Sequence, residues 1–171
     1  MTNSTGASKK SVKIKIHALS DSFFLGKRSD QLSMLIEQQV IPIFEDIGIV
    51  VPVRSCSLVV VLAELTFASA ADLARQLDQS HQLVLQKIPA LERLKLLRRQ
   101  NDPNDKRRKV FQLTSEGHQQ LELINKHIRL IEQAYEKLNA ELGVDVFAVL
   151  GRAIEALKAK DLSTRIDEIA K

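Results

Sequence analysis

The chain has 171 residues, of which 44% are apolar and 27% are charged, so it can bury a core and is not expected to be disordered throughout. It contains only six glycines and four prolines, which argues against the many turns of an all-β protein and for helices. The formal net charge of +4 says little about partners, and the single Cys56 excludes an internal disulfide and any multi-cysteine zinc or iron–sulfur site.

The apolar runs of the sequence are short. The longest, such as residues 58–63, fall far below the roughly 20 residues that span a bilayer. No charged-then-apolar leader opens the chain, so no signal peptide is expected. We therefore expect a cytoplasmic protein.

The first 16 residues carry little helical pattern. Residues 1–11 are small and polar and predict a disordered tail. Val12, Ile14 and Ile16 alternate with polar residues, which predicts a short extended arm. A helical start is the competing interpretation.

A helical period begins near Ser29, and either Ser29 or Asp30 can cap the start of this helix. Pro42 lies inside the pattern and is expected to kink or end the helix near Ile41. The apolar face of this helix consists of Leu32, Leu35, Ile36, Val40 and Ile43. Residues 47–53 are apolar and predict a buried connection, and a second helix is predicted over about 54–65.

Two short helices joined by a polar turn come next. Ser69 and Asp72 have the spacing of a capping box, with Asp in place of the usual Glu, and open a helix that ends at Leu77. The turn at 78–80 can cap another helix over about 81–94. This arrangement is a helix-turn-helix candidate.

A cationic β-hairpin is predicted after these helices. Strands over 96–100 and 109–113 flank an Asn/Asp/Pro-rich loop, and the tip carries Lys106, Arg107 and Arg108. Residues 87–109 hold nine basic and three acidic residues, a net charge of +6 in a chain whose total is +4. Such a local basic block is typical of a phosphate-binding face. A solvated charged hairpin is the alternative.

Thr114 is expected to cap a long helix that Gly143 ends. A second amphipathic helix follows over 146–157, and after Lys160 the pattern weakens into a charged end. The long helix has a coiled-coil-like seam of Leu121, Ile124, Ile128, Ile131, Tyr135, Leu138 and Leu142. A symmetric dimer would bury this seam and place two recognition helices on one face of DNA. The alternative is packing within the chain against the 32–43 helix.

Several stretches resemble motifs of the MarR family of winged helix-turn-helix transcription regulators, over about residues 29–160. The family's wing signature resembles Arg99-x-x-Asp102-Pro103-x-Asp105-Lys106-Arg107 followed by Leu113-Thr114-x-x-Gly117. Asp72-Leu73-Ala74 resembles the family's Glu-Leu-Ala motif in the first helix of the helix-turn-helix. Leu91-Glu92 resembles the Leu-Glu motif at the end of the family's recognition helix. The resemblance implies a homodimer whose first and last helices form the dimerisation region.

The chain departs from the family pattern around its recognition helix. The family usually has Gly at the position of Lys95, and Ser or Thr followed by Arg at the positions of Leu85 and Gln86. Pro89 removes the backbone donor to Leu85, so the helix is expected to bend or to be divided.

A recognition helix in the major groove reads base edges with donors and acceptors. Gln82 and Gln86 share a face and can pair bidentately with adenine; the alternative is a solvated surface. Ile88 and Leu91 are expected to face the core. The predicted DNA contacts of this helix are Ser80, His81, Gln82, Gln86 and Lys87.

The hairpin tip is the second predicted contact. Arg107 suits a narrow minor groove, because its flat cation matches the negative potential there. Asp105 is expected to orient the Arg107 guanidinium. The predicted cations nearer the phosphates are Arg99, Lys106, Arg108 and Lys109. An ordinary charged turn is the alternative.

The resemblance also implies a small, often aromatic, anionic effector. Arg54 is a weak candidate for binding it, and a plain surface cation is the favoured alternative. Cys56 lies at a helix start, where the dipole lowers a thiol pKa, so it is a weak candidate for redox sensing. It can equally be a small core residue. No histidine spacing indicates a metal, and no nucleophile or phosphate-loop motif is present, so neither an enzyme nor a cofactor is expected.

The sequence thus predicts a mainly α protein with a β-hairpin wing. It is expected to begin with a tail over 1–11, followed by an arm with a dimerisation helix over 12–53 and a DNA-binding lobe over 54–113. C-terminal dimerisation helices over 114–160 and a charged end over 161–171 complete the chain. The expected function is a ligand-responsive repressor that binds double-stranded DNA as a homodimer. Two alternatives are a winged-helix adaptor that binds proteins without a DNA function and a redox-sensing regulator that uses Cys56.

Overall fold

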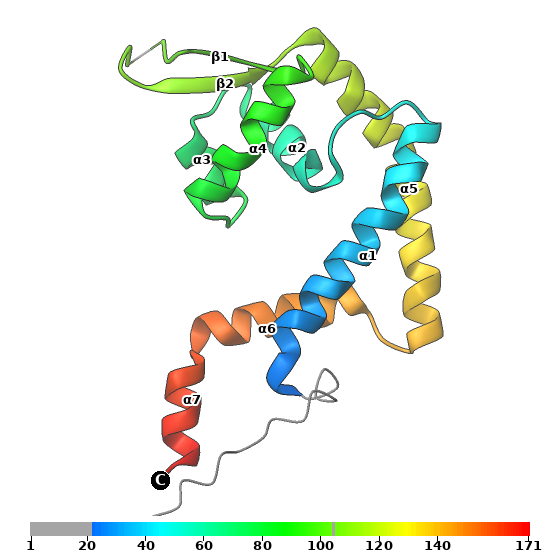
Figure 1. The fold of residues 1–171 in the computed structure, drawn as a ribbon, viewed down its shortest axis with the longest axis vertical. Helices are drawn as coiled ribbons and strands as arrows, with labels where there is room; N and C mark the ends of the chain where they lie inside the picture. The colour runs from blue at the N-terminus through cyan, green and yellow to red at the C-terminus, as the bar shows by residue number, and fades with distance from the viewer. Residues whose placement is uncertain (1–21, 104) are drawn as a thin grey trace, which may run out of the picture.

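The computed structural model describes residues 22–103 and 105–171 (Figure 1). The predicted tail and extended arm lie outside these residues. The described chain is mainly helical with one two-stranded antiparallel sheet, which confirms the predicted fold class. Its elements are η2 (Ser22–Phe24), α1 (Leu25–Asp46), η3 (Val53–Ser55), α2 (Cys56–Leu65), α3 (Ala70–Gln76), α4 (His81–Arg93), β1 (Leu97–Asn101), β2 (Lys109–Leu113), α5 (Ser115–Leu142), α6 (Val146–Ala159) and α7 (Leu162–Ile169).

The first helix, α1, begins at Leu25, four residues before the predicted start. Its N-cap residue is Phe24, which forms no side-chain cap hydrogen bond, so neither Ser29 nor Asp30 caps it. The Ser29 hydroxyl instead donates to the Leu25 carbonyl oxygen at 3.1 Å, inside the helix. Serine can satisfy its hydroxyl in this way, and a serine in a sequence is therefore not always a cap.

Two prolines lie inside continuous helices. Of the two effects predicted for Pro42, a kink or an end near Ile41, the end does not occur, because α1 continues past the proline. Likewise α4 is not divided at Pro89. In each helix a buried apolar residue follows the proline within two positions, Phe44 in α1 and Leu91 in α4. Packing of such a face supplies most of a helix's stability and can outweigh one lost backbone hydrogen bond.

A compact lobe forms from α2, α3, α4 and the β1–β2 hairpin. The two strands pair from Leu97 with Leu113 to Asn101 with Lys109. Ala68 and Phe111 exchange backbone hydrogen bonds of 3.0 and 2.8 Å, which attach the loop before α3 to the hairpin. The most deeply buried side chains of the lobe are Leu58, Val59, Leu62, Leu73, Val84, Ile88, Leu91, Leu96 and Val110.

The C-terminal helices lie partly outside the lobe (Figure 1). Helix α5 is capped by Thr114, and Gly143 ends it in the left-handed conformation, as predicted. Residues 161–171 are not merely a charged end, because Asp161 caps α7 by accepting a hydrogen bond from the Thr164 backbone N–H at 2.8 Å. The eight residues of α7 are too few for a clear sequence period. Lys158 of α6 forms an ion pair with Asp78, in the turn between α3 and α4.

The seam of α5 is only half covered within the chain. Ile124 is buried, and Leu121 and Ile131 pack against the core of the chain. Leu138 and Leu142 remain exposed. Among the described residues no helix is both long and apolar enough to span a membrane.

Candidate nucleic-acid interface

The two helices of the helix-turn-helix have the predicted caps. The Ser69 hydroxyl accepts a hydrogen bond from the Asp72 backbone N–H at 3.2 Å, and the Asp72 carboxylate accepts one from the Ser69 backbone N–H at 3.0 Å. The Ser80 hydroxyl accepts one from the Leu83 backbone N–H at 3.2 Å at the start of α4. These bonds satisfy orphan N–H groups and fix where each helix begins.

Both helices end in a left-handed residue that is not glycine. Asp78 after α3 has φ 51° and Lys95 after α4 has φ 57°. The Lys95 N–H donates to the Glu92 carbonyl oxygen and the Leu96 N–H to the Leu91 carbonyl oxygen, both at 2.9 Å, which is a Schellman motif. The turn after α4 thus has the backbone conformation that glycine favours, although Lys95 occupies it.

Helix α4 presents most of its predicted contacts to solvent. Val84, Ile88 and Leu91 are buried on its inner face. The exposed residues include Ser80, His81, Gln82 and Gln86, which the structure brings together on the outer side of the helix.

Lys87 does not belong to this exposed set. Its Nζ donates to Gln79 Oε1 at 2.8 Å, so it braces the turn between α3 and α4. Desolvation by partial burial, and secondarily the positive charge of Arg54, lower the pKa of Lys87. The sequence could not show this, because the bracing depends on how the turn folds back on the helix.

An exposed leucine was missed on the same helix. Leu85 is 44% exposed and lies off the buried Val84–Ile88–Leu91 face. The helical period alone would have separated it from the core positions. In the sequence, Leu85 stands out only as a departure from the family pattern, which has Ser or Thr at this position.

At the tip of the hairpin, Asp105 acts on backbone and not on a side chain. Its Oδ1 accepts a hydrogen bond from the Arg107 backbone N–H at 2.9 Å, so the prediction that it orients the Arg107 guanidinium is wrong. A short aspartate side chain typically closes a turn onto the N–H two residues on. The side-chain cations of Lys106 and Arg107 are exposed and form no ion pair with another described residue.

Arg108 turns inward, in contrast to its neighbours. Its guanidinium bonds Asp102 Oδ2 at 3.3 Å, Ser69 Oγ at 2.9 Å and the Asp72 carboxylate. Asp102 is buried. Two carboxylates thus balance the positive charge of Arg108, and its contact with phosphates stays a prediction.

This network also affects Asp72. Partial desolvation raises the pKa of Asp72, but hydrogen bonds from Ser69 and the charges of Arg108 and Arg75 outweigh it and hold that pKa below 3.8. The start of α3 and the hairpin are thus joined through an ionised carboxylate.

Arg99 and Lys109 also have partners in the hairpin. Arg99 pairs with Glu92 at 3.2 Å and lies 5.3 Å from the centre of the Phe111 ring, and Lys109 donates to the Asn101 side chain. The Arg99 side chain is 49% exposed, and Lys109 is exposed as well. The cations of the hairpin therefore divide into two groups. Those along the strands are braced, whereas Lys106 and Arg107 at the tip have no ion-pair partner among residues 22–103 and 105–171.

The weak effector and redox candidates are not favoured by their surroundings. Arg54 Nε donates to Glu37 Oε2 at 2.6 Å, so its charge already has a counterion. Burial raises the pKa of the Cys56 thiol to about 11, so the expected lowering by the helix start is wrong and the thiol is protonated at neutral pH. No cluster of three His, Cys, Asp or Glu side chains that fits a metal occurs among the described residues.

The glycine of the Leu-Thr-x-x-Gly motif allows α5 to approach the turn after α4. A Cβ on Gly117 would lie 2.0 Å from the Leu96 carbonyl oxygen. The Thr114 hydroxyl donates to the Lys95 carbonyl oxygen at 2.6 Å. The Thr114 backbone N–H donates to the Leu96 carbonyl oxygen at 3.1 Å. The motif therefore anchors the base of the hairpin to the first turn of α5.

Comparisons with known proteins agree with this geometry. Residues 55–117 match the model of a winged helix DNA-binding domain, and no curated protein sequence matches the chain.

Solved structures that share the fold include three transcriptional regulators. A mutant of MarR from E. coli complexed with operator DNA is 15% identical with a TM-score of 0.62, over 81% of this chain and 96% of that chain. The PcaV transcriptional regulator from Streptomyces coelicolor, in complex with its natural ligand, is 18% identical with a TM-score of 0.60, over 85% and 97%. CouR, a transcriptional repressor bound to a 23-mer DNA duplex, is 18% identical with a TM-score of 0.62, over 85% and 99%. Residues 55–117 thus form a winged helix DNA-binding domain, in a chain with the fold of the MarR-family regulators that its motifs resemble.

Proposed function

We propose that this chain regulates transcription by binding double-stranded DNA in a sequence-specific manner. The observation that carries the proposal is the combination of an exposed polar face on α4 with two cations at the tip of the adjacent hairpin, which form no ion pair within the described part of the chain. Figure 1 shows α3, α4 and the hairpin together on the side of the lobe away from α5. One duplex can therefore meet the helix and the hairpin at once.

In this proposal α4 enters the major groove and the hairpin tip lies over the neighbouring minor groove. Gln82 and Gln86 supply the donors and acceptors that pair with base edges, while Lys106 supplies sequence-independent attraction to the phosphates. Arg107 is the residue for the minor groove, because its guanidinium has no counterion among the described residues. Repression follows where such a complex blocks access to a promoter, and CouR is a repressor with this fold.

The first experiment is fluorescence anisotropy with a labelled random duplex at low ionic strength. We expect binding that weakens steeply with salt, because each neutralised phosphate releases counterions. Arg107→Ala should bind about tenfold more weakly, with a shallower salt slope and an unchanged melting temperature. Lys126→Ala, which removes the same charge from an exposed position on α5, is the matched control and should bind as the parent does.

The outcomes separate the candidate functions. Equal binding by the parent and Arg107→Ala would reject the assignment of Arg107. Failure of the parent to bind any duplex at low salt would reject the DNA function and favour a winged-helix adaptor that binds proteins.

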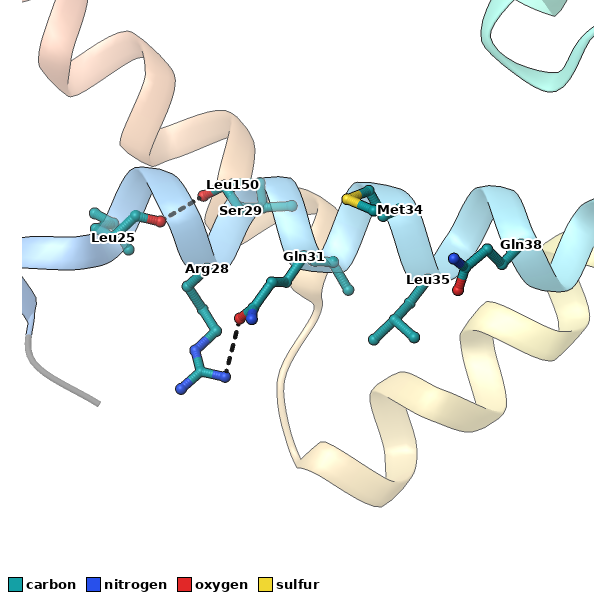
Figure 2. Close-up of a pocket in the computed structure, with 9 residues that line it drawn as sticks. Leu25, Arg28, Ser29, Gln31, Met34, Leu35, Gln38 and Leu150 are labelled. Carbon is teal, nitrogen blue, oxygen red and sulfur yellow. Dashed lines mark hydrogen bonds between the residues drawn. The ribbon is translucent and has the colours of Figure 1, made fainter. Parts of the chain in front are cut away.

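We also propose that the chain acts as a homodimer. Within the chain, α6 and α7 bury none of their residues, and Phe147 is 87% exposed. A hollow of about 650 Å³ runs along α1 between Leu25, Met34, Leu35 and Leu150 of α6 (Figure 2). Contiguous apolar surface of this kind typically marks an interface, and a symmetric dimer buries it in both copies.

Light scattering at micromolar concentration should therefore give twice the mass of one chain. Leu35→Glu, placed in this hollow, should shift the mass toward one chain and weaken DNA binding, because a monomer contacts a single half-site. A monomeric parent protein would contradict the dimer.

The same proposal includes a small-molecule effector, as PcaV is in complex with its natural ligand. A hollow of about 750 Å³ between α1, α5 and α6, lined in part by Tyr135, has the size of ligand pockets. Coupling to DNA requires that the effector bind one arrangement of the dimer more tightly than the other.

A further inference from the structure

Leu85 is one of two exposed leucines on α4, the other being Leu83. Leu85 lies beside a hollow of about 350 Å³ bounded by α4, the start of α3 and the hairpin strands. Ala71 and Phe111 line the same hollow, together with His81 one helical turn before Leu85. The leucine is therefore positioned between the two parts of the lobe that the proposed function places on DNA.

The surroundings of Leu85 restrict what can cover it. Arg99 and Lys109 line the hollow with their cationic side chains, so an anionic partner is favoured nearby. The apolar area of one half-exposed leucine is far smaller than the core of a protein–protein interface. A partner must then present a strong negative charge and a small apolar group within a few ångströms of each other.

Duplex DNA combines these two features in its major groove. The phosphates carry the negative charge, and the C5-methyl group of thymine is the one apolar group on a base edge. Leucine offers no donor or acceptor, so it cannot satisfy the exocyclic amine of cytosine or adenine and would leave those groups without a partner. Contact with a thymine methyl group is the interaction that this side chain can make.

We propose that Leu85 contacts a thymine methyl group in the major groove and makes the chain select thymine at that position of each half-site. This inference rests on the proposed function, because it assigns a base preference to the same interface. Gln82 and Gln86 read neighbouring base edges by hydrogen bonds, whereas Leu85 reads by apolar contact.

The test begins with sites selected by the full-length protein from random duplex. Each thymine of the selected site is then replaced by deoxyuridine, which removes only the methyl group and keeps every hydrogen-bonding group. We expect one thymine per half-site at which this replacement weakens binding three- to fourfold, as for loss of one buried methyl group.

Leu85→Ala should bind the thymine and uracil sites equally, because the shortened side chain no longer reaches the methyl group. Leu83→Ala is the matched control, since Leu83 is also an exposed leucine of α4 but does not line this hollow. It should keep the full uracil effect. Both variants should melt like the parent, because each removes an exposed side chain from a helix.

Each outcome has a separate meaning. A parent protein that binds no duplex contradicts the proposed function itself. A parent that binds but is insensitive to uracil at every position overturns only the role of Leu85. An unchanged uracil effect in Leu85→Ala, or its loss in Leu83→Ala, also overturns the assignment to Leu85.

Discussion

Replacing Gly117 with alanine is expected to lower the free energy of unfolding by about 3 kcal/mol, because the new methyl group has no space. Its Cβ would lie 2.0 Å from the carbonyl oxygen of Leu96, 3.1 Å from the carbonyl carbon and 3.3 Å from Leu113 Cβ. The nearest of these atoms belong to the backbone and cannot swing away as the end of a flexible side chain can. The first turn of α5 must therefore separate from the turn that precedes β1.

This separation would also break hydrogen bonds. The Leu96 carbonyl oxygen accepts the Thr114 N–H at 3.1 Å, and the Gly117 N–H donates to Thr114 Oγ1 at 3.1 Å. Both bonds depend on the close approach that the glycine permits. We expect Gly117→Ala to lose hairpin packing together with global stability.

Urea denaturation followed by circular dichroism measures the change. Gly151→Ala in α6 is the matched control, because a Cβ there meets no atom within 4 Å. That substitution should leave stability unchanged or raise it by up to about 1 kcal/mol, as alanine is the better helix former. Equal stability of the two variants would show that the close approach of Gly117 to Leu96 does not affect the free energy of unfolding.

Local features of the fold were predictable from the sequence. The caps at Ser69, Ser80 and Thr114, and the helix end at Gly143, each depend on a few neighbouring residues and all occur as predicted. The hairpin was predictable for the same reason, since an Asn/Asp/Pro-rich loop between two apolar runs indicates a turn.

Features that depend on tertiary packing were not predictable. Arg108 looked equivalent to Arg107 in the sequence, yet it bonds Asp72, which lies 36 residues earlier. Lys87 looked like a member of the recognition face, yet it bonds Gln79 across the turn. Pro42 looked like a helix end, yet burial of Phe44 beyond it accompanies a continuous helix. In each case a distant or buried partner decides the outcome, and spacing along the chain does not show it.

The neighbouring arginines of the hairpin lead to the second prediction of a large effect. Arg108→Ala should lower the free energy of unfolding by about 2 kcal/mol, whereas Arg107→Ala should change it by less than about 0.5 kcal/mol. Arg108 bonds Ser69 Oγ, Asp72 and the buried Asp102, so its loss removes charge-assisted hydrogen bonds from two carboxylates. The expected loss in the free energy of unfolding is smaller than for a fully buried ion pair, because the Arg108 side chain is 43% exposed.

The pH dependence distinguishes lost charge pairing from lost packing. Arg108 is one of the groups that hold the pKa of Asp72 below its unfolded value of 3.8. This contribution is fully present above pH 3.8 and is lost as the pH falls through the lower pKa of the folded state. The stability gap between the parent and Arg108→Ala should therefore be widest near neutral pH and should narrow below about pH 4. A gap that stays constant over this range would assign the loss to packing, and stability unchanged in Arg108→Ala would show that this network does not hold the hairpin to α3.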